Sequence, residues 1–564
     1  MEPRRIVLAV VLMAAVLILT PYIFPTPTPL PGSTPVATDS RSRDAAAATA
    51  TPAAPGAALP TAGSGTVGAL PDSAAAQPPV VTPIDTATIR TKTADFRTTN
   101  KGAALIGASL TQYQALSNGG RTRSGTVELA LPNDKLLGFR LVVPGDTIDL
   151  AKQTFTSAQS EANGNTVVTY DAAIQGRAVS IRYSFLPDSY RVNVSATVTG
   201  VAENSYLLVD LPPGFRTSEA DSTEDFNHLA YAYKPELSAA EGIKFSSLDP
   251  GEREIEAGPI TWAVAKNKYF ILGVLAPKGA PGFAEVNVTG GPRIGKNATR
   301  GQATLVTPLK AGNAAFELYV GPQEFKRLVA LGREFETSNP YGGWIQGIVQ
   351  PFATIVIRLL LWMKATLGLS YGWILVIFGV AIRIILWPLN QKAMRSSMMM
   401  QRIQPELQAI QTRYKNDPQK LQQAMMQVYK EHGMSPFSSL SGCLPMLIPL
   451  PVFFALFFVF QNTIEFRGVP FLWFPDISVK DPYYIIPILV AVTTLLMSWI
   501  GMRGMKANEQ QKMMMYLMPA MMLVFFFSMA SGLNLYYFIQ NLASLPQQWL
   551  ISQERTKATP IVRG

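Results

Sequence analysis

The chain has 564 residues, so we expect at least two structural regions. It is 48% hydrophobic with a formal net charge of +10, which favours a membrane protein with basic cytoplasmic loops over a nucleic-acid-binding protein. Its single cysteine, Cys443, excludes an internal disulfide and a cysteine-based metal cluster. The two histidines, His228 and His432, lie far apart and outside every apolar run, which argues against zinc hydrolases and Ser-His-Asp enzymes. These counts imply no cofactor.

Six apolar runs are predicted to cross a membrane as helices, because about 20 residues span the hydrocarbon core. They are Ile6–Phe24, Tyr371–Leu389, Leu444–Phe460, Tyr483–Ile500, Met513–Met529 and Leu533–Ile551. The first run follows Arg4 and Arg5 and lacks a small-x-small cleavage pattern. We therefore interpret residues 1–24 as an uncleaved signal anchor.

The region between the first and second runs divides into two parts. Residues 25–84 are rich in Pro, Ala, Thr and Ser and are predicted to form a disordered tether. Residues 85–335 contain short alternating apolar runs, such as 178–186, 191–200 and 283–290, separated by Gly and Pro turns. This pattern predicts an all-β sandwich. Two interpretations stay open for it, a scaffold or a domain that binds sugars or peptides.

A further apolar stretch, 344–364, carries Pro351, Arg358 and Lys364. If it crossed the membrane, the basic segment 390–440 would lie outside, against the usual enrichment of Lys and Arg in cytoplasmic loops. We therefore predict an interfacial amphipathic helix over 340–369, broken by Pro351. The result is a six-span topology with both termini in the cytoplasm.

Residues 390–435 are predicted to form a cytoplasmic helical hairpin, because apolar residues recur on one face of each arm. Asp417 and Pro418 supply the N-cap and the first turn of the second helix. The hairpin either is stabilised by its own apolar seam or docks ribosomes, targeting factors or anionic lipid headgroups through its basic face. The tail 552–564 is predicted to lie on the same side. The candidate docking residues are Arg395, Arg402, Arg413, Lys415 and Lys420.

Arg383 lies inside the second predicted span, about 4 to 5 Å beyond its centre at 1.5 Å per residue. The six spans contain no Asp or Glu, so no intramembrane carboxylate neutralises this cation. Snorkelling toward cytoplasmic water is one interpretation. However, Cα–Cβ bonds tilt toward the helix N-terminus, which here is the outer side. We therefore expect Arg383 to meet water or an acidic group from another molecule.

One face of the last span is polar. It either bonds neighbouring helices or, together with Arg383, lines a hydrated concavity, and we favour the concavity. The Phe- and Met-rich stretches 451–460 and 513–529 either face lipid or accept varied client helices. The residues of the polar face, at spacings of 3, 4, 3 and 4, are Asn534, Tyr537, Asn541, Ser544 and Gln548.

Four stretches of the sequence carry a resemblance to a known family: "RIILWPL" (383–389), "SGCLPMLIPLPVFFALF" (441–457), "DPYYIIPIL" (481–489) and "SGLNLYYFIQNLASLPQQWLI" (531–551). Through these motifs the chain resembles the YidC family of membrane-protein insertases. The resemblance implies an inserting protein of the bacterial inner membrane without an energy source, whose partners are nascent membrane proteins and the Sec translocon. It also implies a periplasmic β-supersandwich within residues 25–370, and five core helices around a groove open to the cytoplasm and to lipid.

Within this resemblance, Arg383 matches the groove arginine and Tyr537 a groove tyrosine. Gly379 stands where relatives often carry a hydroxyl residue, and Pro449 where they often carry Gln, so these walls are expected to be less polar. The implied mechanism is docking of a short acidic client tail near Arg383, followed by sliding of the apolar segment into lipid.

Three other functions would require different features in the sequence. A transporter or channel requires a route through both faces and usually internal repeats, which we do not find among the later spans. An intramembrane protease requires a base beside a nucleophile or two aspartates, and the six spans contain no His, Asp or Glu. We therefore expect no enzymatic activity. An assembly chaperone differs from an insertase only in degree.

Overall fold

The computed structural model describes residues 84–117, 122–219, 221–295, 297–339, 346–415, 417–432, 450–503 and 509–557. The predicted signal anchor, residues 25–83 of the predicted tether, residues 444–449 of the third predicted span and Pro449 with them lie outside these ranges.

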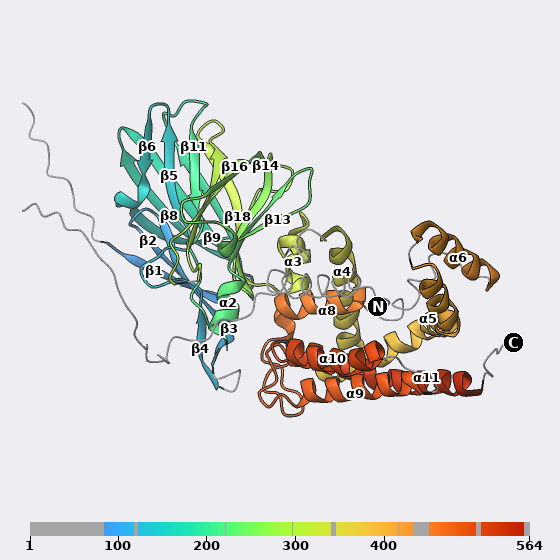
Figure 1. Ribbon diagram of the computed structural model, residues 1–564. Coiled ribbons are helices and arrows are strands. Elements are labelled where there is room, and N and C mark those ends of the chain that lie inside the picture. The colour runs from blue at the N-terminus through green and yellow to red at the C-terminus, as the bar shows by residue number, and fades with distance from the viewer. Residues whose placement is uncertain are drawn as a thin grey trace, which may run out of the picture. The chain divides into compact units, whose positions relative to one another are not determined.

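A small antiparallel sheet begins the described chain, with its strands in sequence order (Figure 1). Ile89 and Phe96, paired across the first two strands, are both buried. This sheet therefore contributes one apolar face to the domain core. Its strands are β1 Thr86–Arg90, β2 Ala94–Thr99, β3 Ala104–Ser117 and β4 Thr122–Glu128.

The second sheet has 14 strands within the described residues, in the order β6-β5-β11-β17-β16-β14-β15-β18-β10-β9-β8-β7, with β12 paired to β13 and β14. All its neighbouring strands run antiparallel. Its strands are β5 Gly138–Val143, β6 Asp146–Asp149, β7 Thr156–Ala162, β8 Asn165–Ile174, β9 Arg177–Phe185, β10 Arg191–Val198, β11 Tyr206–Asp210, β12 Ala230–Pro235, β13 Glu241–Lys244, β14 Arg253–Lys266, β15 Phe270–Leu275, β16 Phe283–Gly290, β17 Gly301–Pro308 and β18 Asn313–Pro322.

Alternating burial explains why these segments form strands. In β10, Val192, Val194 and Ala196 are buried in the domain core, while the residues between them face outward. The runs 178–186, 191–200 and 283–290 coincide with β9, β10 and β16, so the predicted β region is confirmed. The prediction did not include two short helices, α2 Ser222–Asn227 and α3 Phe325–Leu331.

Beyond the β domain, the described chain is mainly helical and has an apolar core of its own. Two of its segments, Tyr371–Arg395 and Ile485–Met502, are long and apolar enough to cross a membrane, while Leu450–Asn462 and Met515–Phe526 are shorter apolar helices. The helices are α4 Gln346–Leu367, α5 Tyr371–Arg413, α6 Pro418–Glu431, α8 Leu450–Asn462, α9 Ile485–Met502, α10 Glu509–Phe526 and α11 Ser531–Lys557.

Helix α4 occupies most of the predicted interfacial segment, but the prediction that Pro351 breaks it is wrong. Because this proline lies in the second turn, it removes one backbone hydrogen bond close to the helix start. One side of α4, including Ala353 and Leu360, is buried in the helical core, while Ile355 and Trp362 on the other side are 61% exposed. This two-sided burial agrees with an amphipathic helix.

The helix pair predicted over 390–435 is present. Helix α5 continues without a break beyond the apolar segment to Arg413, and α6 begins at Pro418. The Asp417 carboxylate accepts a hydrogen bond from the Lys420 backbone N–H at 3.1 Å, as expected for an N-cap. Ile403 and Leu407 of α5 share a small apolar cluster with α6, which closes the pair.

The segment between α8 and α9 contacts the β domain. Ile464 belongs to the β-domain core, and Glu465 accepts a hydrogen bond from the Phe325 backbone N–H at 3.0 Å. Arg467 forms an ion pair with Glu219 at 2.8 Å, and each side chain is only 5% exposed. We call residues 463–484 the docking loop, because these contacts join it to the β domain.

We expect the docking loop to make the stability of the folded protein depend on pH, because it contains the buried carboxyl group of Glu465. Burial raises the pKa of Glu465 from its ordinary value of 4.5 to about 7. Burial thus favours the protonated form of Glu465 in the folded state. The stability that this protonated carboxyl group contributes to the fold is complete below pH 4.5 and is lost as the pH rises through 7. At 1.36 kcal/mol per pKa unit, the loss is at most about 3 kcal/mol.

We expect Glu465→Gln to raise the melting temperature at pH 8 and to leave it nearly unchanged at pH 4.5, measured by thermal unfolding in detergent. Asp225 keeps part of the pH slope in the variant, because burial also raises the pKa of this carboxyl group to about 7. An unchanged melting temperature at pH 8 would show that Glu465 does not carry the cost of a buried charge.

Candidate functional site

The guanidinium of Arg383 lies between α5 and α11. Its Nη2 donates a hydrogen bond to Oε1 of Gln547 at 2.6 Å, and Nε2 of Gln547 donates to the Trp387 carbonyl at 3.0 Å. Gln547 is 1% exposed and Arg383 is half-buried. The two helices are therefore joined by a short polar bridge.

This bridge leaves the charge of Arg383 uncompensated. Within the described residues no carboxylate forms an ion pair with it, and its Nε–H is buried without a hydrogen-bond partner. A buried donor without a partner costs about 1 to 3 kcal/mol. The site can therefore gain free energy by accepting an anionic or polar group, provided that the group reaches Nε.

Gly379 allows α5 and α11 to approach closely one turn before Arg383. A Cβ atom at this position would lie 3.1 Å from Cγ2 of Ile539 and 3.5 Å from the Tyr536 ring. The Phe378 ring packs on the Tyr536 ring with centroids 5.7 Å apart. Gly379 thus acts in helix packing, and its surroundings are apolar, as expected.

A second polar face of α11 points toward α5, and the sequence prediction missed it. Tyr536 accepts a hydrogen bond from Gln540 at 2.9 Å, and Gln547 follows seven residues later on the same side of the helix. The spacings of 4 and 7 residues between Tyr536, Gln540 and Gln547 could have indicated this face from the sequence. It was overlooked because the neighbouring face has five polar residues instead of three.

The predicted polar face is directed mainly at other helices. Asn534 donates to the Phe526 carbonyl at 2.9 Å, and Asn541 donates to the Thr494 hydroxyl at 3.0 Å. Ser544 lies 3.0 Å from the sulfur of Met497, and a Cβ at Gly501 would lie 2.5 Å from Nε2 of Gln548. The preferred interpretation, a hydrated concavity along this face, does not match these contacts, because α9 and α10 supply polar partners for it.

Tyr537 lies on the side of α11 that faces α8 and α10. Its ring centroid is 5.9 Å from that of Phe453 and 4.9 Å from that of Phe526. It is therefore placed among the aromatic side chains of the Phe-rich helices, whereas Arg383 contacts the Gln547 side of α11. The structure does not bring these two predicted groove residues into contact.

The predicted docking cations differ in their surroundings. Arg395 forms an exposed ion pair with Glu554 at 3.0 Å, which links α5 to α11. Lys420 pairs with Asp417 at 3.2 Å, and Arg413 lies over the Tyr414 ring. Lys415 is exposed, and the side chain of Arg402 lies outside the described part of the structure. The hairpin thus presents a basic but partly neutralised surface.

Comparisons with known proteins agree along the chain. The family described as "60Kd inner membrane protein" matches residues 362–558, and "YidC periplasmic domain" matches residues 86–355. "Membrane protein insertase YidC" of Chlorobaculum tepidum is 33% identical over 436 residues, which cover 72% of this chain and 71% of that protein. Its counterpart from Chlorobaculum parvum is 32% identical over 432 residues, covering 72% and 70%.

Among solved structures, one described as "Active YidC insertase crystal structure with the first transmembrane domain resolved" covers 83% of this chain and 95% of its own chain. Its sequence identity is 18% and its TM-score is 0.33.

Proposed function

Since this chain belongs to the YidC family of membrane protein insertases, we propose that it inserts its clients through the polar site between α5 and α11. The protein is a membrane protein insertase with a periplasmic β domain, and the members of its family are inner-membrane proteins. Its substrates are nascent membrane proteins. Membership of this family supports the insertase function and does not support the alternative function, a transporter or channel.

The uncompensated charge of Arg383 carries the proposal. A short acidic segment of a client docks beside Arg383, where Gln547 and Gln540 add polar contacts from α11. Polar contacts lower the cost of holding such a segment part-way across a low-dielectric barrier. Affinity stays moderate, because the bound segment must leave again.

The apolar part of the client then moves along the Phe- and Met-rich helices α8 and α10 into lipid. Exposed side chains such as Val524 (70%) and Tyr516 (64%) support a lipid- or client-facing surface on α10. Burial of the apolar segment in the hydrocarbon core drives the step, so no energy source is needed. Tyr537 lies between α8 and α10 and is a candidate contact for the passing helix.

The proposed topology has six spans, formed by Ile6–Phe24 and by the apolar parts of α5, α8, α9, α10 and α11. Both termini and the α5–α6 hairpin lie in the cytoplasm, where the positive charges are then concentrated. In this topology Arg413 and Lys415 of the hairpin face incoming ribosomes or targeting factors. The protein inserts clients alone or together with the Sec translocon.

The proposal is tested with the purified chain in proteoliposomes and a single-span client whose short exported tail carries two or three acidic residues. Changing these residues to Asn and Gln removes the attraction to Arg383, and we expect insertion to fall by about tenfold, which corresponds to 1.4 kcal/mol. Protease protection of the tail measures insertion. Equal insertion of both clients would contradict the proposed role of the charge.

A further inference from the structure

The docking loop is attached to two parts of the molecule through different kinds of bond. Toward α11 the backbone makes the contact, because the N–H of Ser531 donates to the Val479 carbonyl at 2.7 Å. Toward the β domain the contacts include titratable side chains, namely the ion pair of Arg467 with Glu219 and the carboxyl group of Glu465. A change of protonation can therefore loosen the β domain while the attachment to α11 stays in place.

Two carboxyl groups of this loop are buried with one oxygen unbonded. Oε1 of Glu465 accepts the hydrogen bond from the Phe325 backbone N–H, while its Oε2 is buried without a partner among the described residues. Asp476 is 1% exposed, and its Oδ1 accepts hydrogen bonds from the N–H and the hydroxyl of Ser478 at 2.8 and 2.7 Å. Its Oδ2 is likewise buried without a partner in the described part of the chain. Since burying an uncompensated charge costs far more than burying a neutral carboxyl group, this geometry favours the protonated form of both.

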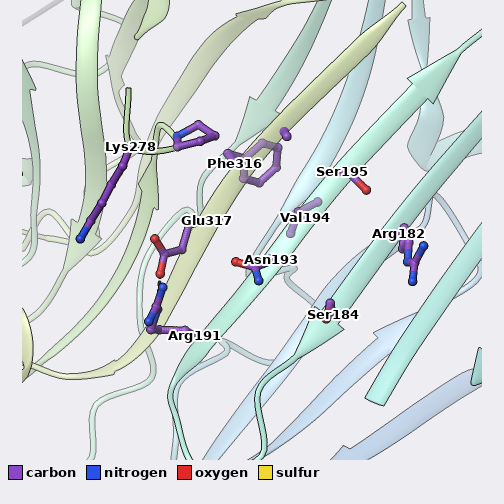
Figure 2. A pocket seen from close by; sticks show the side chains of 11 residues that line it. Arg182, Ser184, Arg191, Asn193, Val194, Ser195, Lys278, Phe316 and Glu317 are labelled. Carbon is purple, nitrogen blue, oxygen red and sulfur yellow. Dashed lines mark hydrogen bonds and ion pairs between the residues drawn. The ribbon is translucent and has the colours of Figure 1, made fainter. Parts of the chain in front are cut away.

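A carboxylate elsewhere in the β domain shows how a buried charge is compensated. Glu317 of β18 is 8% exposed, and each of its oxygens meets an arginine. Figure 2 shows Glu317 beside Arg191, and Nη2 of Arg333 donates to its other oxygen at 2.5 Å. Within the described residues, neither Glu465 nor Asp476 has such an ion pair.

The buried cations near Asp476 are already paired. Nε of Arg467 donates to the two oxygens of Glu219 at 3.0 and 2.8 Å, and Nζ of Lys268 lies 2.5 Å from Oε1 of Glu224. The other titratable groups of this region are Asp225, His228, Tyr269 and the pair of Asp221 with Lys480 at 3.9 Å. Burial lowers the pKa of His228 and keeps it neutral. Five carboxyl groups, including Asp476, thus share three cations, an excess that bound protons remove.

Glu465 also lacks a buried cation. The neighbouring carboxylate, Glu324 at the start of α3, pairs with Arg327 of the same helix. Lys326 is the remaining cation near Glu465 among the described residues, and it is exposed, so it compensates a buried charge poorly. The other titratable groups around Glu465 are Tyr319 and Tyr371.

We propose that Glu465 and Asp476 bind protons that hold the β domain on the docking loop, and that loss of these protons releases the β domain while the loop stays on α11. Ionisation places charge on buried oxygens that have no hydrogen-bond donor, so water must reach them and the contact opens. This attachment does not depend on client insertion beside Arg383.

The direction of the pH dependence follows from the closed state. Burial raises the pKa of Glu465 from 4.5 to about 7 and also raises the pKa of Asp476. Because the closed state favours the neutral carboxyl groups, the contact is tightest at pH 4.5 and below, and it weakens as the pH rises through 7.

The test is amide hydrogen exchange of the full chain in nanodiscs between pH 5 and pH 8, with rates corrected for the intrinsic pH dependence of exchange. Mass spectrometry follows peptides that cover 463–469 and 325–331, on the two sides of the contact, and 531–535 at the start of α11 as the internal reference. A contact that retains one proton loses up to about tenfold in protection per pH unit. We expect protection of 463–469 and 325–331 to fall at least about tenfold over this range, and protection of 531–535 to change less than about threefold.

The variant Glu465→Gln with Asp476→Asn removes both titrating groups and keeps the oxygen that each side chain uses as an acceptor. We expect its protection to stay within about threefold between pH 5 and pH 8. The matched control, Glu161→Gln with Asp188→Asn, makes the same changes at exposed positions of the β domain and should retain the pH dependence of the natural chain. Melting temperatures at pH 5 verify that both variants fold.

An unchanged protection of the natural chain between pH 5 and pH 8 would overturn the inference, and this outcome needs no variant. The same pH dependence in the Glu465→Gln, Asp476→Asn variant would also overturn it. An equal loss of protection at 531–535 would do so too, because the whole chain would then be unfolding. Arg383→Glu should leave the pH dependence unchanged, so failure of this attachment is distinguishable from failure of the insertion site.

Discussion

Arg383→Glu is expected to reduce insertion of an acid-tailed single-span client by at least about tenfold, whereas Arg383→Lys reduces it only mildly. The charge reversal places a carboxylate where the acidic tail must dock, and Gln547 loses the guanidinium that it now bonds at 2.6 Å. Lysine keeps the charge but offers a compact ammonium group in place of a planar fork, so part of the geometry is lost. Insertion is measured by protease protection in proteoliposomes.

A charge swap separates this effect from damage to the fold. A client whose tail carries Lys in place of Asp should be inserted better by the Arg383→Glu variant than by the natural chain. A variant that inserts neither client and melts at a lower temperature would point to a structural role. Undiminished insertion of the acid-tailed client by Arg383→Glu would refute the proposed role of the charge.

Arg467→Ala is expected to destabilise the attachment of the docking loop by about 3 to 5 kcal/mol. The substitution leaves the Glu219 carboxylate buried without its cation, and it also removes hydrogen bonds to the Gln114 and Ser218 carbonyls. Burial already raises the pKa of Glu219, so this carboxylate depends on Arg467 for its charged form. Limited proteolysis within 463–484 and the melting temperature measure the loss.

Arg123→Ala is the matched control for this prediction. Arg123 donates one exposed hydrogen bond to the Gly468 carbonyl at 2.7 Å, also between the β domain and the docking loop. Its loss should cost less than about 1 kcal/mol, because water replaces an exposed bond at little cost. If the two variants melt at the same temperature, the buried pair does not hold the loop.

Local patterns in the sequence predicted several elements of the fold, although not the short helices α2 and α3. Alternating apolar residues predicted β9, β10 and β16, and the helical spacing of Ile403 and Leu407 predicted the seam between α5 and α6. Both patterns show which side of a segment packs against a core. That side is determined by residues that lie close together in the sequence. Pro351 shows the limit of this reasoning, because a proline near a helix start is tolerated when tertiary packing holds the helix.

The partners of each polar face could not be predicted in the same way. Asn541 and Gln540 are neighbours on α11, yet Asn541 bonds hydroxyls of α9 while Gln540 faces the Arg383 side with Tyr536. Helical periodicity groups residues into faces, but it does not say which helix packs against each face. The ion pair of Arg467 with Glu219 joins residues 248 positions apart, and no local pattern indicates such a contact.

Gln540 and Asn541 also provide the most direct test of the insertion site, because both are 8% exposed and they lie on different faces of the same helix. A photo-crosslinking amino acid is placed at position 540 or at position 541, and each variant is presented with a ribosome-stalled nascent chain that ends in an acidic single-span client. Our account predicts strong crosslinks to the client tail from position 540 and weak ones from position 541. Crosslinks from 541 alone, or from neither position, would contradict insertion beside Arg383.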